Sequence, residues 1–223
     1  MSLRIRKLAE LVQKGTIPAD IGTDHGLLPI LLVEQGIVQK AYACDVAEGP
    51  LSQARANIAA HGCQDQIVPV LSDGFEQVPS DADCAVIAGM GWFTACRILE
   101  EADGRLHAMK QIIVQVNQDV SCLRTWICEH GYTIHSELTV MERSLYYTIV
   151  EFSCRKHSPY SEREILCGPL DAIRDSDAFQ NQVAHELNRL RFVNERRGGD
   201  SQIQKQIALW EESSVLLKRR QNC

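Results

Sequence analysis

The segment from Ala19 to Gly26 places two aspartates, a histidine and two glycines close together, between two apolar runs. We expect a strand over 16–21 and a helix over 25–35. A glycine-bearing turn between a strand and a helix is where an α/β sheet holds a nucleotide-like ligand, because the backbone can approach and the helix start offers N–H groups. The spacing D-x-G-x-x-x-G differs from the G-x-G-x-x-G of dinucleotide sites. A tight turn without a ligand is the alternative.

Similar residues follow the next three predicted strands. Asp45 is placed to accept hydrogen bonds from both hydroxyls of a ribose, and Asp73 can accept one from an adenine amino group. The glycines on either side of Met90 would leave backbone exposed beside a ligand. Each group could also serve only a turn, but parallel strands end at one edge of a sheet. Together they predict an adenosyl-type cofactor site that consists of Asp20, Gly22, Asp24, Asp45, Asp73, Gly74, Gly89 and Met90.

Strands and helices alternate along the first two thirds of the chain. The predicted strands are 16–21, 38–45, 67–71, 84–88, 111–115, 132–140 and 144–152. The long apolar runs suit a parallel sheet covered on both faces. The last two strands, joined by a turn over 141–143, are expected to pair as an antiparallel hairpin. The prediction is an α/β fold with a seven-stranded, mostly parallel, Rossmann-like sheet and an antiparallel edge hairpin.

The pattern changes to helices after Cys154. A capping box is predicted at Ser161, and Gly198-Gly199 separates two helical segments. The two apolar stripes predict an antiparallel, coiled-coil-like helical hairpin; they consist of Phe179, Val183, Leu187 and Leu190, and of Ile203, Ile207, Trp210 and Leu217. We therefore divide the chain into a domain over 1–154 and a helical domain over 155–223.

Composition is typical of a cytoplasmic globular protein. The chain has 223 residues, a net charge of −6 and 45% hydrophobic residues, and we find neither a membrane-spanning run nor a signal-peptide core. Its nine cysteines include no C-x-x-C pair, so we expect reduced thiols and no metal site.

Basic residues concentrate toward the C-terminus of this acidic chain. Residues 1–150 hold 11 Lys and Arg against 18 Asp and Glu, a net charge of −7, and residues 151–223 hold 12 against 11, a net charge of +1. Such clusters can contact phosphates, and a solvated helix surface is the alternative. The candidate phosphate contacts are Arg4, Arg189, Arg191, Arg196 and Arg197.

Two motifs, D-I-G-T-D-H over 20–25 and I-A-G-M-G over 87–91, are more specific. With them the whole chain resembles the bacterial tRNA (adenine-N1)-methyltransferases that modify adenine 22, the TrmK family of class I S-adenosylmethionine-dependent methyltransferases. Glycine and proline are usual in that family where this chain has Trp92 and Val116. Further matching segments are 2–5, 28–30, 48–50, 73–74, 115–117 and 131–132, together with Leu123, Arg124 and Trp126.

The resemblance implies that the chain transfers a methyl group from S-adenosyl-L-methionine to N1 of an adenine in tRNA, leaving S-adenosyl-L-homocysteine. N1 already has a lone pair, so catalysis needs an acceptor for the hydrogens on N6 and for the released proton rather than a covalent nucleophile. The candidate catalytic residues are Asp24, His25 and Asn117, with local roles for His25 and Asn117 as alternatives. Because a stacked adenine must be extruded, we expect the basic helical domain to hold tRNA. Arg4 contacts a phosphate or forms a salt bridge.

Three other functions remain open at this point. The chain could methylate another RNA, a protein or a small molecule. It could instead be a non-catalytic S-adenosylmethionine-binding module whose helical hairpin contacts partner proteins. Asp45 would also suit a nicotinamide-dependent oxidoreductase, which the missing G-x-G-x-x-G disfavours. We expect a monomer.

Overall fold

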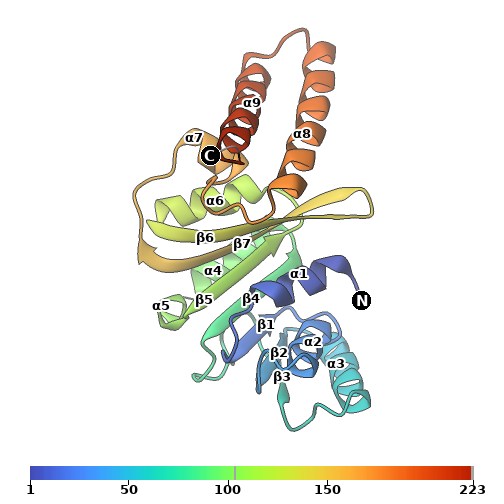
Figure 1. The fold of residues 1–223 in the computed structure, drawn as a ribbon. Coiled ribbons are helices and arrows are strands. Elements are labelled where there is room, and N and C mark those ends of the chain that lie inside the picture. The colour runs from blue at the N-terminus through green and yellow to red at the C-terminus, as the bar shows by residue number, and fades with distance from the viewer. Residues whose placement is uncertain (103, 222–223) are drawn as a thin grey trace.

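The computed structural model describes residues 1–102 and 104–221, and its strands form one sheet in the order β3-β2-β1-β4-β5-β7-β6 (Figure 1). The strands are β1 Pro18–Ile21, β2 Ala41–Asp45, β3 Ile67–Leu71, β4 Cys84–Met90, β5 Gln111–Val116, β6 Tyr132–Glu142 and β7 Leu145–Lys156. β1 pairs in parallel with both β2 and β4, so the strand order reverses at this point. β7 lies antiparallel between β5 and β6. The predicted mostly parallel sheet with an antiparallel edge hairpin is confirmed.

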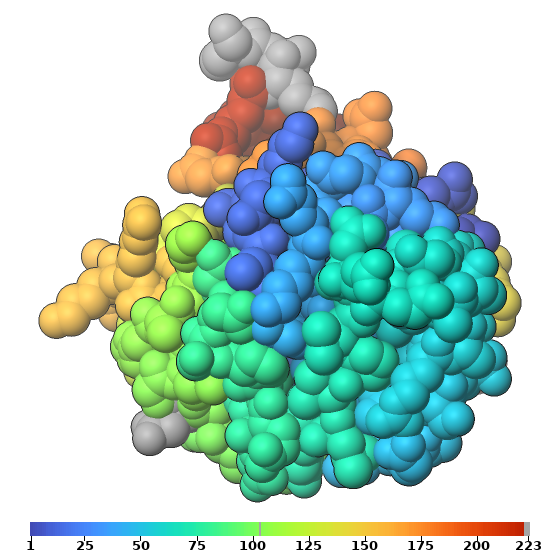
Figure 2. Space-filling view, turned by 90° about the horizontal axis from the view of Figure 1, so that it is seen from below, coloured from blue at the N-terminus to red at the C-terminus, as the bar shows by residue number. Residues whose placement is uncertain are grey.

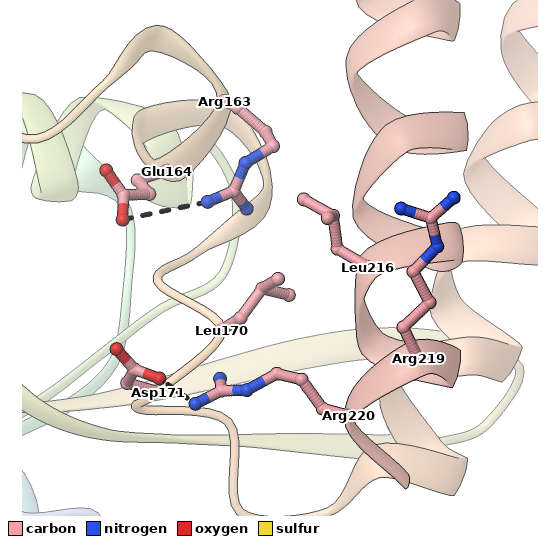
Figure 3. Close-up of a pocket in the computed structure, with 7 residues that line it drawn as sticks. All are labelled: Arg163, Glu164, Leu170, Asp171, Leu216, Arg219 and Arg220. Atoms are coloured by element: carbon pink, nitrogen blue, oxygen red, sulfur yellow. Dashed lines mark hydrogen bonds and ion pairs between the residues drawn. The ribbon is translucent and has the colours of Figure 1, made fainter. Parts of the chain in front are cut away.

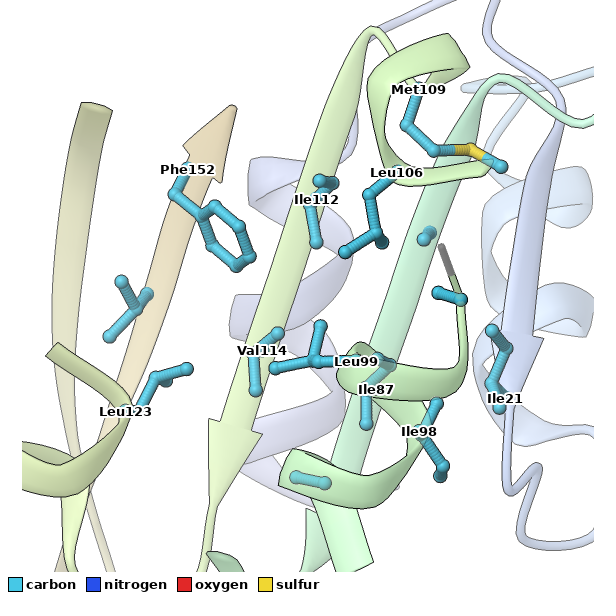
Figure 4. Close-up of a cluster of buried hydrophobic side chains, with 14 of the residues drawn as sticks. Ile21, Ile87, Ile98, Leu99, Leu106, Met109, Ile112, Val114, Leu123 and Phe152 are labelled. Carbon is cyan, nitrogen blue, oxygen red and sulfur yellow. The ribbon is translucent and has the colours of Figure 1, made fainter. Parts of the chain in front are cut away.

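Helices cover both faces of the sheet because its strands are apolar on both sides. Along β4, Val86 belongs to the core under one group of helices and Ile87 to the core under the other. Figure 4 shows Leu99 lying over Ile87 and Val114 in the second core. The first group is α1 Leu3–Leu11, α2 Leu27–Glu34 and α3 Glu48–Ala60, and the second is α4 Trp92–Glu101, α5 Arg105–Ala108 and α6 Val120–Glu129.

The hairpin between β6 and β7 turns later than predicted. Glu142 pairs with Leu145, so the expected turn over 141–143 is wrong. Arg143 and Ser144 form the turn instead, with φ of 51° and 66°. Two residues with positive φ give a turn whose twist matches that of the flanking strands.

The C-terminal part consists of α7 Glu162–Cys167, α8 Ser176–Arg196 and α9 Ser201–Gln221. Figure 1 shows α8 and α9 side by side, projecting from the sheet, and in Figure 2 the N-terminal half of the chain covers most of the opposite end. Gly198 and Gly199 reverse the chain with φ of 69° and 91°. The predicted helical hairpin and the capping box at Ser161 are confirmed.

A buried ion pair ties this helical part to the sheet. Arg124 of α6 donates to both oxygens of Glu137 at 2.8 Å, and both side chains are nearly inaccessible. Nη1 of Arg124 also donates to the carbonyls of Ile165 and Leu166 in α7, at 3.2 and 2.9 Å. The division of the chain into two domains between residues 154 and 155 stays a prediction. β7 continues two residues beyond Cys154, to Lys156.

No helix in the described part of the chain combines the length and the apolar character that crossing a membrane requires. Within residues 1–102 and 104–221, we find no grouping of three or more His, Cys, Asp or Glu suited to a metal ion. The cysteines in this part of the chain are free thiols.

Candidate active site

The turn after β1 brings together the ends of three strands. Gly22 has a φ of 77°, in the left-handed region that favours glycine. A Cβ atom at this position would lie only 2.8 Å from Cε of Met90, at the end of β4. The N–H groups of Gly22 and Thr23 donate to the carbonyl of Cys44 in β2, at 2.9 and 2.8 Å. Any larger residue at position 22 would therefore have to displace Met90.

The carboxyl group of Asp20 is buried at the end of β1, where Thr23 Oγ1 donates to its Oδ2 at 2.6 Å. Burial raises the pKa of Asp20 from 3.8 to about 6, and the carboxylates of Asp24 and Asp45 act in the same direction. The Thr23 hydrogen bond opposes this shift. Three carboxyl groups thus converge at the switch point of the sheet, which favours a ligand with a positively charged centre.

Asp24 and His25 lie on the exposed side of the same turn. His25 Nε2 is 3.0 Å from Asp24 Oδ1, and both side chains face solvent. His25 has a φ of 61°, and its carbonyl accepts a hydrogen bond from Asn57 Nδ2 at 2.9 Å. The helix begins at Leu27 rather than at His25 as predicted, because His25 and Gly26 belong to the turn that precedes it. An exposed carboxylate–imidazole pair, in a turn fixed by the hydrogen bond from Asn57, can accept a proton and transfer it to solvent.

The acids after β2 and β3 have different surroundings. Asp45 is partly buried, and its Oδ1 accepts the backbone N–H of Ala47 at 2.9 Å. Asp73 forms a two-pronged ion pair with Arg97 of α4, at 2.8 and 3.3 Å. Arg97 also pairs with Glu101 at 2.7 Å. The contact of Arg97 with Asp73 has no local sequence signal, whereas Arg97 and Glu101 have the i, i+4 spacing of a helical ion pair.

A hydrogen-bonded cluster surrounds Asn117 on the other side of β4. Arg4 Nη1 donates to Gln115 Oε1 and Asn117 Oδ1, both at 3.2 Å. Gln115 Oε1 also accepts the N–H of Gly89 at 3.1 Å, and Asn117 Nδ2 donates to the carbonyl of Gly89 at 2.8 Å. The guanidinium of Arg4 lies 5.1 Å from the ring centre of Tyr147. Arg4 therefore fixes the position of the candidate catalytic residue Asn117 by donating to the side-chain amide oxygens of Gln115 and Asn117.

Gln115 and Tyr147 are residues of this cluster that sequence reasoning did not single out as a site. Gln115 is fully buried in β5, where Gln111 is the other buried polar residue among apolar side chains. A polar residue in such a run is the one signal that could have identified it. The contact to Arg4 spans 111 positions of the chain and has no local signature.

A polar groove of about 620 Å³ leads from Asn117 to the helical hairpin. One wall is the segment 116–121, and the other comes from α8 and α9, with Arg189 among the lining residues. Tyr146 of β7 and His185 of α8 have ring centres 5.2 Å apart in this groove. The other predicted arginines are elsewhere: Arg191 pairs with Glu211, Arg196 lies over the ring of Phe192, and Arg197 is 4.0 Å from Asp200.

The structure therefore gathers most of the predicted site residues at one edge of the sheet. Asp20, Gly22 and Met90 meet at the ends of β1 and β4. Gly89 joins them to Asn117. Asp73 and Gly74 follow β3, two strands away from β1 in the sheet.

Known proteins are similar to this chain in sequence and in fold. The methyltransferase domain family matches residues 1–150. A tRNA (adenine(22)-N(1))-methyltransferase from Bacillus subtilis is 27% identical over an alignment of 202 residues that covers 88% of this chain and 85% of the relative. A Streptococcus pneumoniae structure, described as a candidate tRNA (m1A22) methyltransferase in complex with S-adenosyl-L-methionine, is 31% identical with a TM-score of 0.84, covering 96% of this chain and 99% of its own. TrmK of M. capricolum, solved with S-adenosyl-homocysteine, is 29% identical with a TM-score of 0.84, covering 97% and 99%.

The Rossmann-like sheet, its switch-point site and the matching domain define a methyltransferase of the class I type. Within this class the chain belongs to the tRNA (adenine(22)-N1)-methyltransferase family, the TrmK family.

Proposed function

We propose that this enzyme transfers the methyl group of S-adenosyl-L-methionine to N1 of an adenine in tRNA, with adenine 22 as its target. One observation carries the proposal: the end of β4 contacts the turn at Gly22 through Met90 and the Asn117 cluster through Gly89, and Asn117 lines the polar groove. The tRNA (adenine(22)-N(1))-methyltransferase of Bacillus subtilis and the cofactor-bound relatives support the same assignment.

The residues at the switch point fit this cofactor. S-adenosyl-L-methionine supplies a methyl group on a positively charged sulfonium, which is a good leaving group. The carboxylates of Asp20 and Asp24 concentrate negative charge beside that position, and Gly22 leaves backbone exposed there. Asp45 is placed to accept ribose hydroxyls. We assign Asp73, Gly74, Gly89 and Met90 to the remaining walls of the cofactor site.

Among the three candidate catalytic residues, the geometry favours Asp24 as the acceptor for the N6 hydrogens. Its carboxylate is exposed, and only Oδ1 faces His25. Asn117 Oδ1 already accepts hydrogen bonds from Arg4 and Gln115, which occupy both of its lone pairs. We therefore assign proton transfer to Asp24 and His25, and the positioning of the adenine to Asn117. Holding adenine N1 in line with the methyl group supplies much of the rate enhancement.

The polar groove suits unpaired RNA next to the target base. RNA-binding proteins stack splayed bases on aromatic side chains and contact the backbone with arginine. Tyr146 and His185 offer such rings, and Arg189 offers the charge, although it also pairs with Glu186 at 2.8 Å. Gln182 fixes this wall, since it accepts from Thr139 Oγ1 at 3.0 Å. We further propose a cytoplasmic monomer that acts on free tRNA.

The direct test is incubation of the purified protein with unmodified bulk tRNA and methyl-labelled S-adenosyl-L-methionine, followed by nucleoside analysis. We expect the label in 1-methyladenosine. Cofactor binding without label in any nucleoside would contradict the proposal.

A further inference from the structure

A second cavity, of about 530 Å³, lies between α7 and the end of α9 (Figure 3). It shares no lining residue with the groove at Asn117. Three arginines surround it, with Arg163 from α7 and Arg219 and Arg220 from α9. Leu170 and Leu216 lie between them in Figure 3. We call this cavity the arginine pocket.

The charge of Arg163 is poorly compensated. Only 14% of its side chain is exposed, and its Nη1 is buried without a hydrogen-bond partner among the described residues. Its other nitrogens lie 3.6 Å from Glu164 and 3.9 Å from Glu212, beyond hydrogen-bond distance. A buried charged donor without a partner is costly and calls for an explanation.

The carboxylates in the pocket lining, Glu164 and Asp171, offset only part of the charge of the three arginines. Glu164 belongs to the capping box of α7, where its Oε2 accepts from the N–H and the hydroxyl of Ser161 at 2.9 and 2.7 Å. Asp171 pairs with Arg220. Arg219 forms no ion pair with any residue in the described part of the chain. The pocket therefore carries an excess of positive charge beside an apolar wall.

We propose that the arginine pocket binds the phosphate of a nucleotide unit, and that the RNA substrate supplies this unit. Guanidinium forks match the geometry of phosphate oxygens, and the leucines offer an apolar wall to a sugar or base. A volume of about 530 Å³ falls within the ~300–1,000 Å³ of small-ligand pockets and exceeds the needs of a bare ion. The RNA as source rests on the proposed function.

The test compares RNA binding by variants of the pocket with that of a matched control. The double variant Arg219→Gln/Arg220→Gln removes two charges, and Arg163→Lys keeps the charge but removes the fork. Arg55→Gln on α3 is the control, because Arg55 is about as exposed as Arg220 and, among the described residues, its one ion pair is with Glu48. Fluorescence anisotropy would give the affinity for an unmodified tRNA transcript over a series of salt concentrations, and thermal melting would confirm folding.

We expect the double variant to bind tRNA about tenfold more weakly. The slope of its plot of log affinity against log salt concentration should be smaller in magnitude by about 1–2. Arg163→Lys should lose about threefold. Arg55→Gln should match the wild type. Equal affinities and slopes for the pocket variants and the control would overturn the proposal.

Adenosine monophosphate and inorganic phosphate distinguish the source of the phosphate. Calorimetric binding of either compound that the double variant abolishes, with unchanged tRNA affinity, would support a phosphate pocket and overturn RNA as its source. The methylation of bulk tRNA by the wild type is measured separately. A wild type that binds tRNA through the pocket but transfers no methyl group would refute the proposed function alone.

Discussion

The ionisation of Asp20 links the charge of the cofactor site to the stability of the protein. Its pKa is raised from 3.8 to about 6 in the folded chain. Folding therefore favours the protonated form, and this contribution to stability is fully present below about pH 4 and is lost as the pH rises through about 6. At neutral pH the folded protein keeps a buried carboxylate at a cost on the order of 3 kcal/mol.

We predict that Asp20→Asn raises the free energy of unfolding at pH 7.5 by roughly 3 kcal/mol and changes it little at pH 4. The amide can still accept the hydrogen bond from Thr23. Urea unfolding at several pH values would measure this difference. A difference that does not depend on pH would refute the role of the buried charge. The same variant should bind S-adenosyl-L-methionine more weakly, since it lacks the negative charge.

Asp45 and Asp24 should separate cofactor binding from catalysis. Asp45→Asn keeps an acceptor for the N–H of Ala47 but removes a charge, so we expect the cofactor dissociation constant to rise about tenfold. Asp24→Asn removes the proposed proton acceptor and one carboxylate of the cofactor site, so we expect kcat to fall about 100-fold and that constant to rise less than it does for Asp45→Asn. Calorimetry and steady-state kinetics would test both. If each variant changed the parameter assigned to the other, the two roles would be reversed.

Part of the site could be predicted residue by residue. Gly22 and Asp20 were found because a turn after an apolar strand has a local sequence pattern. The contacts of Arg4 with Asn117 and of Arg97 with Asp73 were not found, since they join residues 113 and 24 positions apart. Such contacts depend on how helices pack on the sheet, which one sequence does not encode locally.

At the scale of elements, the Arg124–Glu137 pair connects α6, β6 and α7. Glu137 lies in β6. Gly168, the residue that follows α7, packs against the Glu137 side chain and has a φ of 98°. A Cβ atom at Gly168 would collide with Glu137 Oε2. The backbone of Glu137 also holds the segment before α8, because its N–H donates to the carbonyl of Ala172 at 2.8 Å. The position of the helical hairpin thus depends on this strand.

We predict that Arg124→Ala destabilises the protein by about 3–5 kcal/mol, because it leaves the Glu137 carboxylate buried without a partner. The double variant Arg124→Met/Glu137→Leu should recover most of that loss, since it removes both buried charges. Chemical unfolding of the three proteins would measure the effect. A double variant as unstable as Arg124→Ala would show that packing, and not the unpaired charge, causes the loss.

The elements themselves were largely predictable, with two instructive failures. α4 carries Ala95, Ile98 and Leu99 on its buried face, so the helical period was present but went unrecognised beside the glycines that precede it. The β6–β7 turn was misplaced because Arg143 and Ser144 adopt positive φ, which neither residue type signals.

At the scale of the whole molecule, the cofactor edge and the helical hairpin share the groove at Asn117. Residues from β7, α6, α8 and α9 line it together. The acidic N-terminal part and the nearly balanced C-terminal part fit the proposal that the sheet binds the cofactor and that the hairpin contributes to tRNA binding. Remote binding energy of this kind can be used to position the reacting base.

We predict that deleting residues 176–223 leaves the cofactor dissociation constant within about twofold and lowers kcat/KM for tRNA by at least about 100-fold, equivalent to roughly 2.7 kcal/mol. The cut lies after α7, so the partners of Arg124 remain in place. Circular dichroism would verify the fold, and calorimetry and methylation assays would follow. A truncated protein with full activity on tRNA would refute a role for the hairpin.

Methylation at N1 of adenine 22 in tRNA can be tested with two unmodified transcripts of one tRNA, identical except for guanine in place of adenine 22. Each is incubated with the protein and S-adenosyl-L-methionine and then mapped by reverse transcription, which a methyl group at N1 arrests. We predict arrest at position 22 in the adenine transcript and none in the guanine transcript. Equal methylation of both transcripts, or of neither despite cofactor binding, would contradict adenine 22 as the target of this enzyme.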